Sequence, residues 1–247
     1  QLARLTAGED SITTQVALTS VSASGGMIIQ HYTMALTSER LGPLYSGTTY
    51  FGFFSEQALA DQVGIRDAPI HEPTATERAR GRSLVVPGTP PFPEQRFRMV
   101  DQIDLLVPDS GAHGLGWIHG SIAVDPSTWF FEAHFYQDPV FPGSLGFESF
   151  LQLLKVVALE RWGERLRHTH RFEPILVGRE HTWVYRGQII PSNRRVDVEV
   201  VVTEIQDDPT PTVAGSGFLK VDGIPIYEMK DFGVRLVACL GQRSAQE

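Results

Sequence analysis

The chain has 247 residues, of which 42% are hydrophobic and 20% charged, the composition of an ordinary globular protein. Its formal net charge of −8, without a compensating basic cluster, argues against a nucleic-acid partner. A single cysteine excludes a disulfide framework and a cysteine metal site, and the absence of a long apolar run or a signal-peptide core predicts a cytoplasmic protein without a membrane span.

The N-terminal segment has the pattern of three β-strands. The stretches ITTQVALTSVS, GGMIIQHYTMALTSE and PLYSGTTYFGFF are rich in β-branched residues, alternate in part, and are separated by turn residues. A short helical pattern follows at 56–65. Residues 66–92 carry prolines and charges with little periodicity, which predicts a linker.

The second part contains the only long helix pattern, residues 145–166, in which apolar residues line one side. The helix is expected to begin near Gly143 or Ser144, because Asp138 and Phe141 each precede a proline. Strand patterns precede it at 98–111 and 114–125 and follow it from 173 to 237. Antiparallel strands on both sides of one helix predict an α+β fold, in which a sheet wraps around the helix.

A weak internal repeat relates residues 15–54 to residues 197–236. Each segment has a β-branched strand, a second strand, a tight turn and an ending in Phe-Gly, at Phe51-Gly52 and Phe232-Gly233. The long helix has no counterpart upstream of the first segment. The repeat therefore predicts one complete unit at 93–240, preceded at 1–65 by the second half of a related unit.

His134, a Pro-Gly loop and Glu148 form the one stretch whose pattern suggests acid–base chemistry. A neutral imidazole can remove a proton, and a carboxyl group in an apolar setting can supply one. The first N–H groups of the helix are free to hold a developing oxyanion. Each feature alone is more often structural. Together they suit an elimination of water next to a carbonyl group.

The stretch WFFEAHFYQDPVFPGSLGFESFLQL strongly resembles the bacterial 3-hydroxydecanoyl-ACP dehydratase/isomerase family, which has the hot-dog fold. The flanking stretches GWIHGSIAVDPSTWFF, GQIIPSNRRVDVEV and GFLKVDGIPIYEMKDFGVRL continue the likeness over roughly residues 93–238. The tandem arrangement is similar to the dehydratase regions of polyunsaturated fatty acid synthases. The resemblance thus implies that 1–65 is the C-terminal half of a first hot-dog unit and 93–240 a complete one.

The resemblance also implies roles for individual residues. His134 falls on the catalytic histidine of the family and Glu148 on its acid, while Gly143, Ser144, Val140 and Phe141 fall on the oxyanion and substrate-binding positions. Ser144 stands where the stand-alone enzyme often has cysteine, which puts isomerase activity in doubt. Asp138 is expected to brace the loop. Three other histidines, His113, His119 and His181, lack metal-ligand spacing and nearby acidic partners, which favours strand or surface roles.

The expected activity is dehydration of 3-hydroxyacyl thioesters to 2-enoyl thioesters, in fatty acid or polyketide synthesis. The resemblance implies an acyl carrier protein as partner, whose phosphopantetheine carries the substrate, and neither a metal nor another cofactor. In such enzymes the histidine and the acid of one site come from different hot-dog units. A homodimer mate, which we favour, or another hot-dog unit would supply the second. The alternatives are a non-catalytic acyl-binding module and a hot-dog thioesterase.

Overall fold

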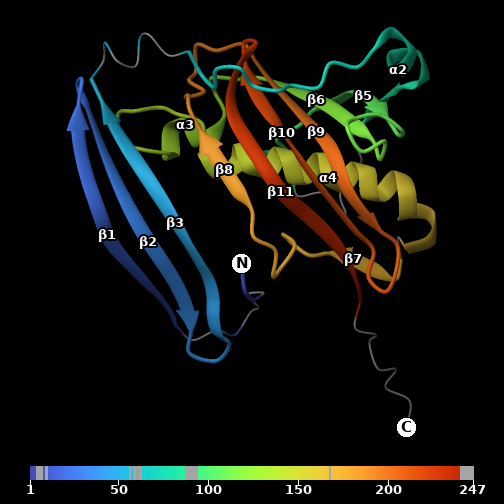
Figure 1. Ribbon diagram of the computed structural model, residues 1–247, viewed down its shortest axis with the longest axis horizontal. Helices are drawn as coiled ribbons and strands as arrows, with labels where there is room; N and C mark the ends of the chain where they lie inside the picture. Colours follow the sequence, from blue (N-terminus) through green and yellow to red (C-terminus); the bar gives the residue numbers. More distant parts are fainter. Residues whose placement is uncertain are drawn as a thin grey trace. The chain divides into compact units, whose positions relative to one another are not determined.

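The computed structural model describes residues 1–3, 8, 11–55, 57, 60, 63–86, 94–166 and 168–239 (Figure 1). The chain divides into two compact units. The N-terminal unit comprises Gln1–Val63 with Leu176–Glu180, and the main unit comprises Gly64–Ile175 with His181–Glu247. Each is described by itself.

The N-terminal unit is a three-stranded antiparallel sheet in the order β1-β2-β3. Its strands are β1 (Ile12–Ser24), β2 (Met27–Ser38) and β3 (Gly42–Phe54), so the three predicted strands are confirmed. Alternation along paired strands places apolar side chains on one face of this sheet. The most exposed of them are Ile12, Val16, Leu18, Val21, Ile28, Phe51 and Phe53, at 44–58%.

The main unit contains an eight-stranded antiparallel sheet and one long helix. The sheet runs in the order β4-β5-β6-β9-β10-β11-β7, and β8 pairs with β11. Its strands are β4 (Arg82–Val85), β5 (Gln102–Val107), β6 (Trp117–Ala123), β7 (His170–Phe172), β8 (Thr182–Tyr185), β9 (Arg195–Gln206), β10 (Thr212–Val221) and β11 (Ile224–Ala238). Its helices are α2 (Ala75–Arg80), the 3₁₀ turn η1 (Gln95–Phe97), α3 (Trp129–Ala133) and α4 (Gly143–Leu166).

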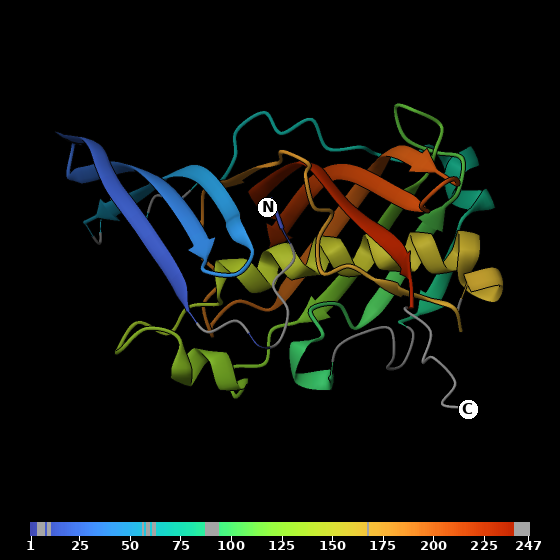
Figure 2. The ribbon, with the colours of Figure 1, turned by 90° about the horizontal axis from the view of Figure 1, so that it is seen from below.

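The long helix α4 begins at the predicted residue and lies along one face of the sheet (Figures 1 and 2). Val198, Val200 and Val202 of β9, each at most 1% exposed, belong to the same apolar core as the helix. The sequence predicts an apolar stripe on one side of the helix. In the structure the stretch 149–158 is buried almost all round, as expected of a central helix.

The predicted hot-dog fold is confirmed by this antiparallel sheet with a long helix packed against it. The repeat also has a structural counterpart, because β1-β2-β3 and β9-β10-β11 are both antiparallel meanders of three consecutive strands.

The segment expected to be a linker, 66–92, holds regular structure in its described part. Thr74 and Glu77 form a capping box at the start of α2, in which each side chain bonds the other's backbone N–H. After it, β4 pairs with β5 and extends the main sheet. The proline-rich remainder, 87–93, and half of the expected helix at 56–65 lie outside the described residues.

No helix in the described part of the chain combines the length and apolar character needed to cross a membrane.

Candidate active site

His134 stands at the C-terminal end of the short helix α3. Phe130 and Phe131 bury one side of that helix in the core, at 5% and 6% exposure. The His134 Nδ1 atom lies 2.9 Å from the Val140 carbonyl oxygen. Because a carbonyl oxygen can only accept, Nδ1 must carry the proton, and the neutral ring then has its lone pair on Nε2. The backbone thus prepares Nε2 as a base.

The loop between His134 and α4 has an unusual backbone. Phe135 and Gln137 adopt positive φ angles of 63° and 58°, a region that residues with side chains seldom occupy. The Phe135 side chain is 63% exposed, and its ring centroid lies 4.2 Å from that of His134. The loop therefore keeps a strained conformation beside the imidazole. Strain of this kind is frequent at functional sites.

The first turn of α4 offers two free N–H groups. The N–H groups of Leu145 and Gly146 donate to the Pro142 carbonyl at 3.0 and 3.2 Å. Those of Gly143 and Ser144 donate no hydrogen bond within the described part of the chain. The helix dipole adds partial positive charge at this end. The first turn can therefore hold an oxyanion.

Val140 and Phe141 anchor the loop to the body of the main unit. The Phe141 N–H donates to the Ile189 carbonyl at 2.8 Å, and the Phe141 ring meets that of Phe130 at a centroid distance of 4.8 Å. Both side chains are at most 5% exposed, whereas Ser144 is exposed. A contact of either Val140 or Phe141 with an acyl chain stays a prediction.

Two aromatic side chains of the sheet fill a notch in the first turn of α4. A methyl group added at Gly146 would lie 2.2 Å from the Tyr227 Cε2 atom, and one added at Gly143 would lie 3.0 Å from the Trp183 Cη2 atom. Neither aromatic ring could approach the helix so closely past a side chain. Because these two glycines have no side chains, Tyr227 and Trp183 can pack against the first turn of α4 and fix its position.

The Tyr227 hydroxyl group is buried beside this turn. It has no hydrogen-bond partner among the described residues, and burial raises its pKa well above the ordinary value. The Tyr185 hydroxyl lies near enough to interact with it, although the geometry falls short of a hydrogen bond. Burial also raises the pKa of Tyr185, and the charge of Asp138 contributes to this shift. Asp138 is thus near Tyr185, while its bracing role stays a prediction.

Glu148 lies on α4 two residues beyond Gly146, and its carboxylate is paired. Its Oε1 atom accepts hydrogen bonds from Lys155 Nζ at 3.0 Å and from Gln152 Nε2 at 3.1 Å. The sequence pattern did not indicate these partners, and the side chain is 25% exposed rather than isolated among apolar groups. No hydrogen bond joins Glu148 to His134 within the described residues. The catalytic roles of both residues stay predictions.

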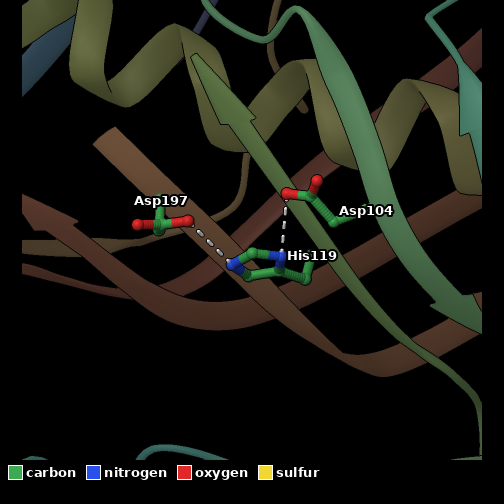
Figure 3. Close-up of side chains that lie close together, drawn as sticks. All are labelled: Asp104, His119 and Asp197. Atoms are coloured by element: carbon green, nitrogen blue, oxygen red, sulfur yellow. Dashed lines mark ion pairs between the residues drawn. The ribbon is translucent and has the colours of Figure 1, made fainter. Parts of the chain in front are cut away.

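A second polar cluster joins three strands of the main sheet (Figure 3). His119 of β6 lies between Asp104 of β5 and Asp197 of β9, with Nδ1 3.2 Å from one carboxylate and Nε2 3.3 Å from the other. The sequence predicts a strand position for His119, which is correct, but no acidic partner. Asp197 was missed because β6 and β9 are neighbours in the sheet and distant in sequence, and Asp104 was missed because the register of β5 against β6 is not visible in the sequence.

The three side chains have the types and spacing that a metal site requires, since their ligand atoms lie within 4.8 Å of one another. Arg195, however, donates to Asp197 at 2.8 Å and to Asp104 at 3.1 Å. Burial opposes ionisation of Asp197, but hydrogen bonds from His119 and Arg195 outweigh it and lower its pKa. The carboxylates are therefore paired within the protein, and the cluster is an ion-pair network across the strands.

Comparison with known proteins identifies the sequence family. A family model described as a FabA-like domain matches residues 92–230, which include His134, Glu148 and the whole of α4. One of the subunits of the polyunsaturated fatty acid synthase of Thraustochytrium sp. (strain ATCC 26185 / S-3) is 32% identical over 244 residues. The alignment covers 89% of this chain and 16% of that protein.

Solved structures show weaker likeness. The dehydratase heterocomplex ApeI:P from Xenorhabdus doucetiae has a TM-score of 0.39 at 14% identity, covering 57% of this chain and 84% of that one. A bifunctional dehydratase-cyclase domain in ambruticin biosynthesis has a TM-score of 0.43 at 13% identity, covering 92% and 69%. A thioesterase from Haemophilus influenzae has a TM-score of 0.35 at 8% identity, covering 54% and 78%.

Proposed function

Because the chain belongs to the FabA-like domain family, we propose that it dehydrates 3-hydroxyacyl thioesters to 2-enoyl thioesters. The observation that carries this proposal is the His134–Val140 hydrogen bond, which directs the basic Nε2 atom outward from a loop that ends in free helical N–H groups. Removal of a proton next to a carbonyl group needs a base and an oxyanion site, and one loop carries both the base and the start of α4.

The reaction can be written with these groups. The thioester oxygen accepts hydrogen bonds from the first turn of α4, at Gly143. His134 Nε2 takes the proton from the carbon next to the carbonyl, and the negative charge that develops on the oxygen is stabilised by the N–H groups. The bond between the third carbon and its hydroxyl group then breaks, with Glu148 engaging that hydroxyl group. The departing hydroxide takes one proton, which in the net balance is the one that His134 removed, and water leaves.

The remaining parts of the proposal follow from this chemistry. We propose that an acyl carrier protein presents the substrate on its phosphopantetheine, since the similar protein is named as part of a polyunsaturated fatty acid synthase. Acid–base groups and positioning suffice for the reaction, so neither a metal nor an organic cofactor is needed. The His134 and Glu148 of one site come from two hot-dog units, either two copies of this chain or this chain and another unit.

The test is an assay of the purified chain with a 3-hydroxyacyl-pantetheine thioester, followed by mass spectrometry. Loss of water supports dehydration, whereas release of free thiol would support the thioesterase alternative. Chromatographic separation of the 2-enoyl and 3-enoyl thioesters, which have the same mass, extends the assay to isomerase activity, the finer expectation that Ser144 puts in doubt.

His134→Ala should lower the rate by about 100- to 10,000-fold, because a positioned base is lost. His113→Ala removes an exposed histidine outside the loop and is the matched control. A His134→Ala variant that is folded and still dehydrates at the control rate would contradict the assignment.

A further inference from the structure

The two oxygens of Glu148 have different surroundings. Oε1 accepts from Lys155 and Gln152, while Oε2 makes no hydrogen bond within the described part of the chain. Both partners of Oε1 are donors, which is the set of contacts that a carboxylate makes. One oxygen is thus fixed to the helix, and the other remains available to a ligand.

The orientation of Gln152 is imposed by the backbone around it. This side chain is fully buried. Its Oε1 atom accepts from the Met99 N–H at 2.9 Å, so its Nε2 atom must face the Phe97 carbonyl, also at 2.9 Å, and Glu148. The amide cannot be reversed without losing both backbone contacts. Gln152 therefore holds Glu148 Oε1 in one place.

Lys155 is the second anchor and has no obvious structural reason to be charged. It is 7% exposed and lies two helical turns beyond Glu148, among buried residues such as Leu154 and Val156. A buried ammonium group is costly without a partner, and Glu148 is its ion-pair partner. Buried ion pairs contribute little net stability compared with apolar residues of similar size. Stability alone therefore does not account for the pair.

We propose that Lys155 is a positioning residue for the dehydration, a role that depends on the function proposed above. Lys155 holds Glu148 as a carboxylate through Oε1, and Oε2 accepts a hydrogen bond from the 3-hydroxyl group of the substrate and orients the bond that breaks. Glu148 does not donate a proton in this scheme. The role of Glu148 thereby changes from the proton donor expected from the sequence to an acceptor.

In this scheme the His134 of the same site both removes the proton and returns it. Nε2 takes the proton as the carbon–hydrogen bond breaks, and the electron pair forms the double bond as the carbon–oxygen bond breaks. The imidazolium gives the same proton to the departing hydroxide. Water leaves, and the imidazole and the carboxylate are both restored without an external proton.

The test compares Lys155→Met and Lys155→Arg with the unchanged chain, using kcat and KM from the thioester assay. Lys155→Met should lower kcat by up to about 100-fold with little change in KM, because Oε2 of Glu148 is no longer held in position for the 3-hydroxyl group. Lys155→Arg should bring kcat back to within about fivefold, because a guanidinium can make the same charge-assisted bond. Lys220→Met is the matched control, since Lys220 pairs with buried Glu199 outside the site.

A double variant separates positioning from folding. If Lys155 acts through Glu148, adding Lys155→Met to Glu148→Gln should cause little further loss of kcat. Lys155→Met at the wild-type rate or faster would overturn the inference, since a proton-donating Glu148 would benefit from loss of the ammonium. Failure of Lys155→Arg to restore kcat in a folded protein, or additive losses in the double variant, would also overturn it. If the unchanged chain removes no water, the proposed function fails with it, whereas an active chain with an active Lys155→Met variant contradicts only the inference.

Discussion

Two three-stranded meanders in this chain differ in what covers their apolar faces. The sheet β1-β2-β3 leaves Val16 56% and Phe53 58% exposed, whereas in β9 of the meander β9-β10-β11 Val198 and Val200 are 1% exposed. The strands have similar patterns and the same antiparallel order. What differs is the helix α4, which packs against the second meander and is part of its core.

The comparison shows that the strand pattern and the site are separate properties of such a meander. β-Branched residues and tight turns suffice to predict the strands in both cases. Among the described residues, the free N–H groups and Glu148 belong to α4, so the chemistry proposed above depends on the helix that crosses the sheet. A meander without a helix thus has neither a closed core nor these functional groups.

The largest expected effect comes from separating the two units. Residues 64–247 should melt cooperatively, because the main unit has its own core. Residues 1–63 alone should show no cooperative transition, since a small sheet with an exposed apolar face buries too little surface. Thermal melting followed by circular dichroism checks both. A cooperative melt of the short piece would show that a meander can fold without a covering helix.

Gly146→Ala should have the next largest effect, because the added methyl group would meet the Tyr227 ring at 2.2 Å. We expect a loss of at least about 3 kcal/mol in the free energy of unfolding, the upper end for overpacking, and a fall in kcat as the first turn of α4 moves. Gly163→Ala is the control, since a methyl group there meets its nearest atoms at an ordinary 3.8 Å. Equal stability of the two variants would contradict the role of the notch.

Substitution of one valine in each meander tests how well the apolar face of each sheet is covered. Val198→Ala should cost about 2 kcal/mol, through lost burial and the cavity left behind. Val16→Ala, at 56% exposure, should cost less than about 0.5 kcal/mol. Denaturant unfolding of both variants gives the two values. Similar costs would mean that the face of β1-β2-β3 is covered in solution.

The smallest effect concerns a contact between α4 and the loop after β9. Asp207 accepts from Arg161 at 3.0 and 2.7 Å and from Trp162 at 2.7 Å, and these hydrogen bonds lower its pKa from 3.8 to about 2. A carboxyl group whose pKa is lowered on folding stabilises the folded state at pH values above its pKa in the unfolded chain. This stabilisation is lost as the pH falls from about 4 to about 2. Asp207→Asn should therefore be less stable than the unchanged chain at neutral pH, and the difference should shrink over this range. A difference in melting temperature that is constant with pH would contradict this.

Much of the architecture could be predicted from local patterns. The start of α4 follows from two prolines and a glycine, and the strands follow from β-branched residues between turns. The regular structure within 66–92 was missed because prolines and charges mask a capping box and a four-residue strand that is stabilised by pairing with β5. Such a strand carries too few residues to show a period of its own.

The sequence predicted which residues form the site, but it did not predict the contacts that those residues make. The His134–Val140 hydrogen bond depends on the left-handed backbone at Phe135 and Gln137, which no sequence pattern indicates. Lys155 could have been found, because residues seven apart share one face of a helix. Tyr227 and Trp183 could not, since their packing on the glycines of α4 depends on how the sheet folds back over the helix.

The notch at Gly143 and Gly146 also limits how α4 can lie along its own axis. A slide of one turn, about 5.4 Å, would bring Pro142 or Phe150 to the place where Gly146 now admits the Tyr227 ring. Neither residue leaves room for that ring. A slide of a full turn in either direction is therefore excluded, and among the described residues the sheet sets the position of the helix terminus without a hydrogen bond to its free N–H groups.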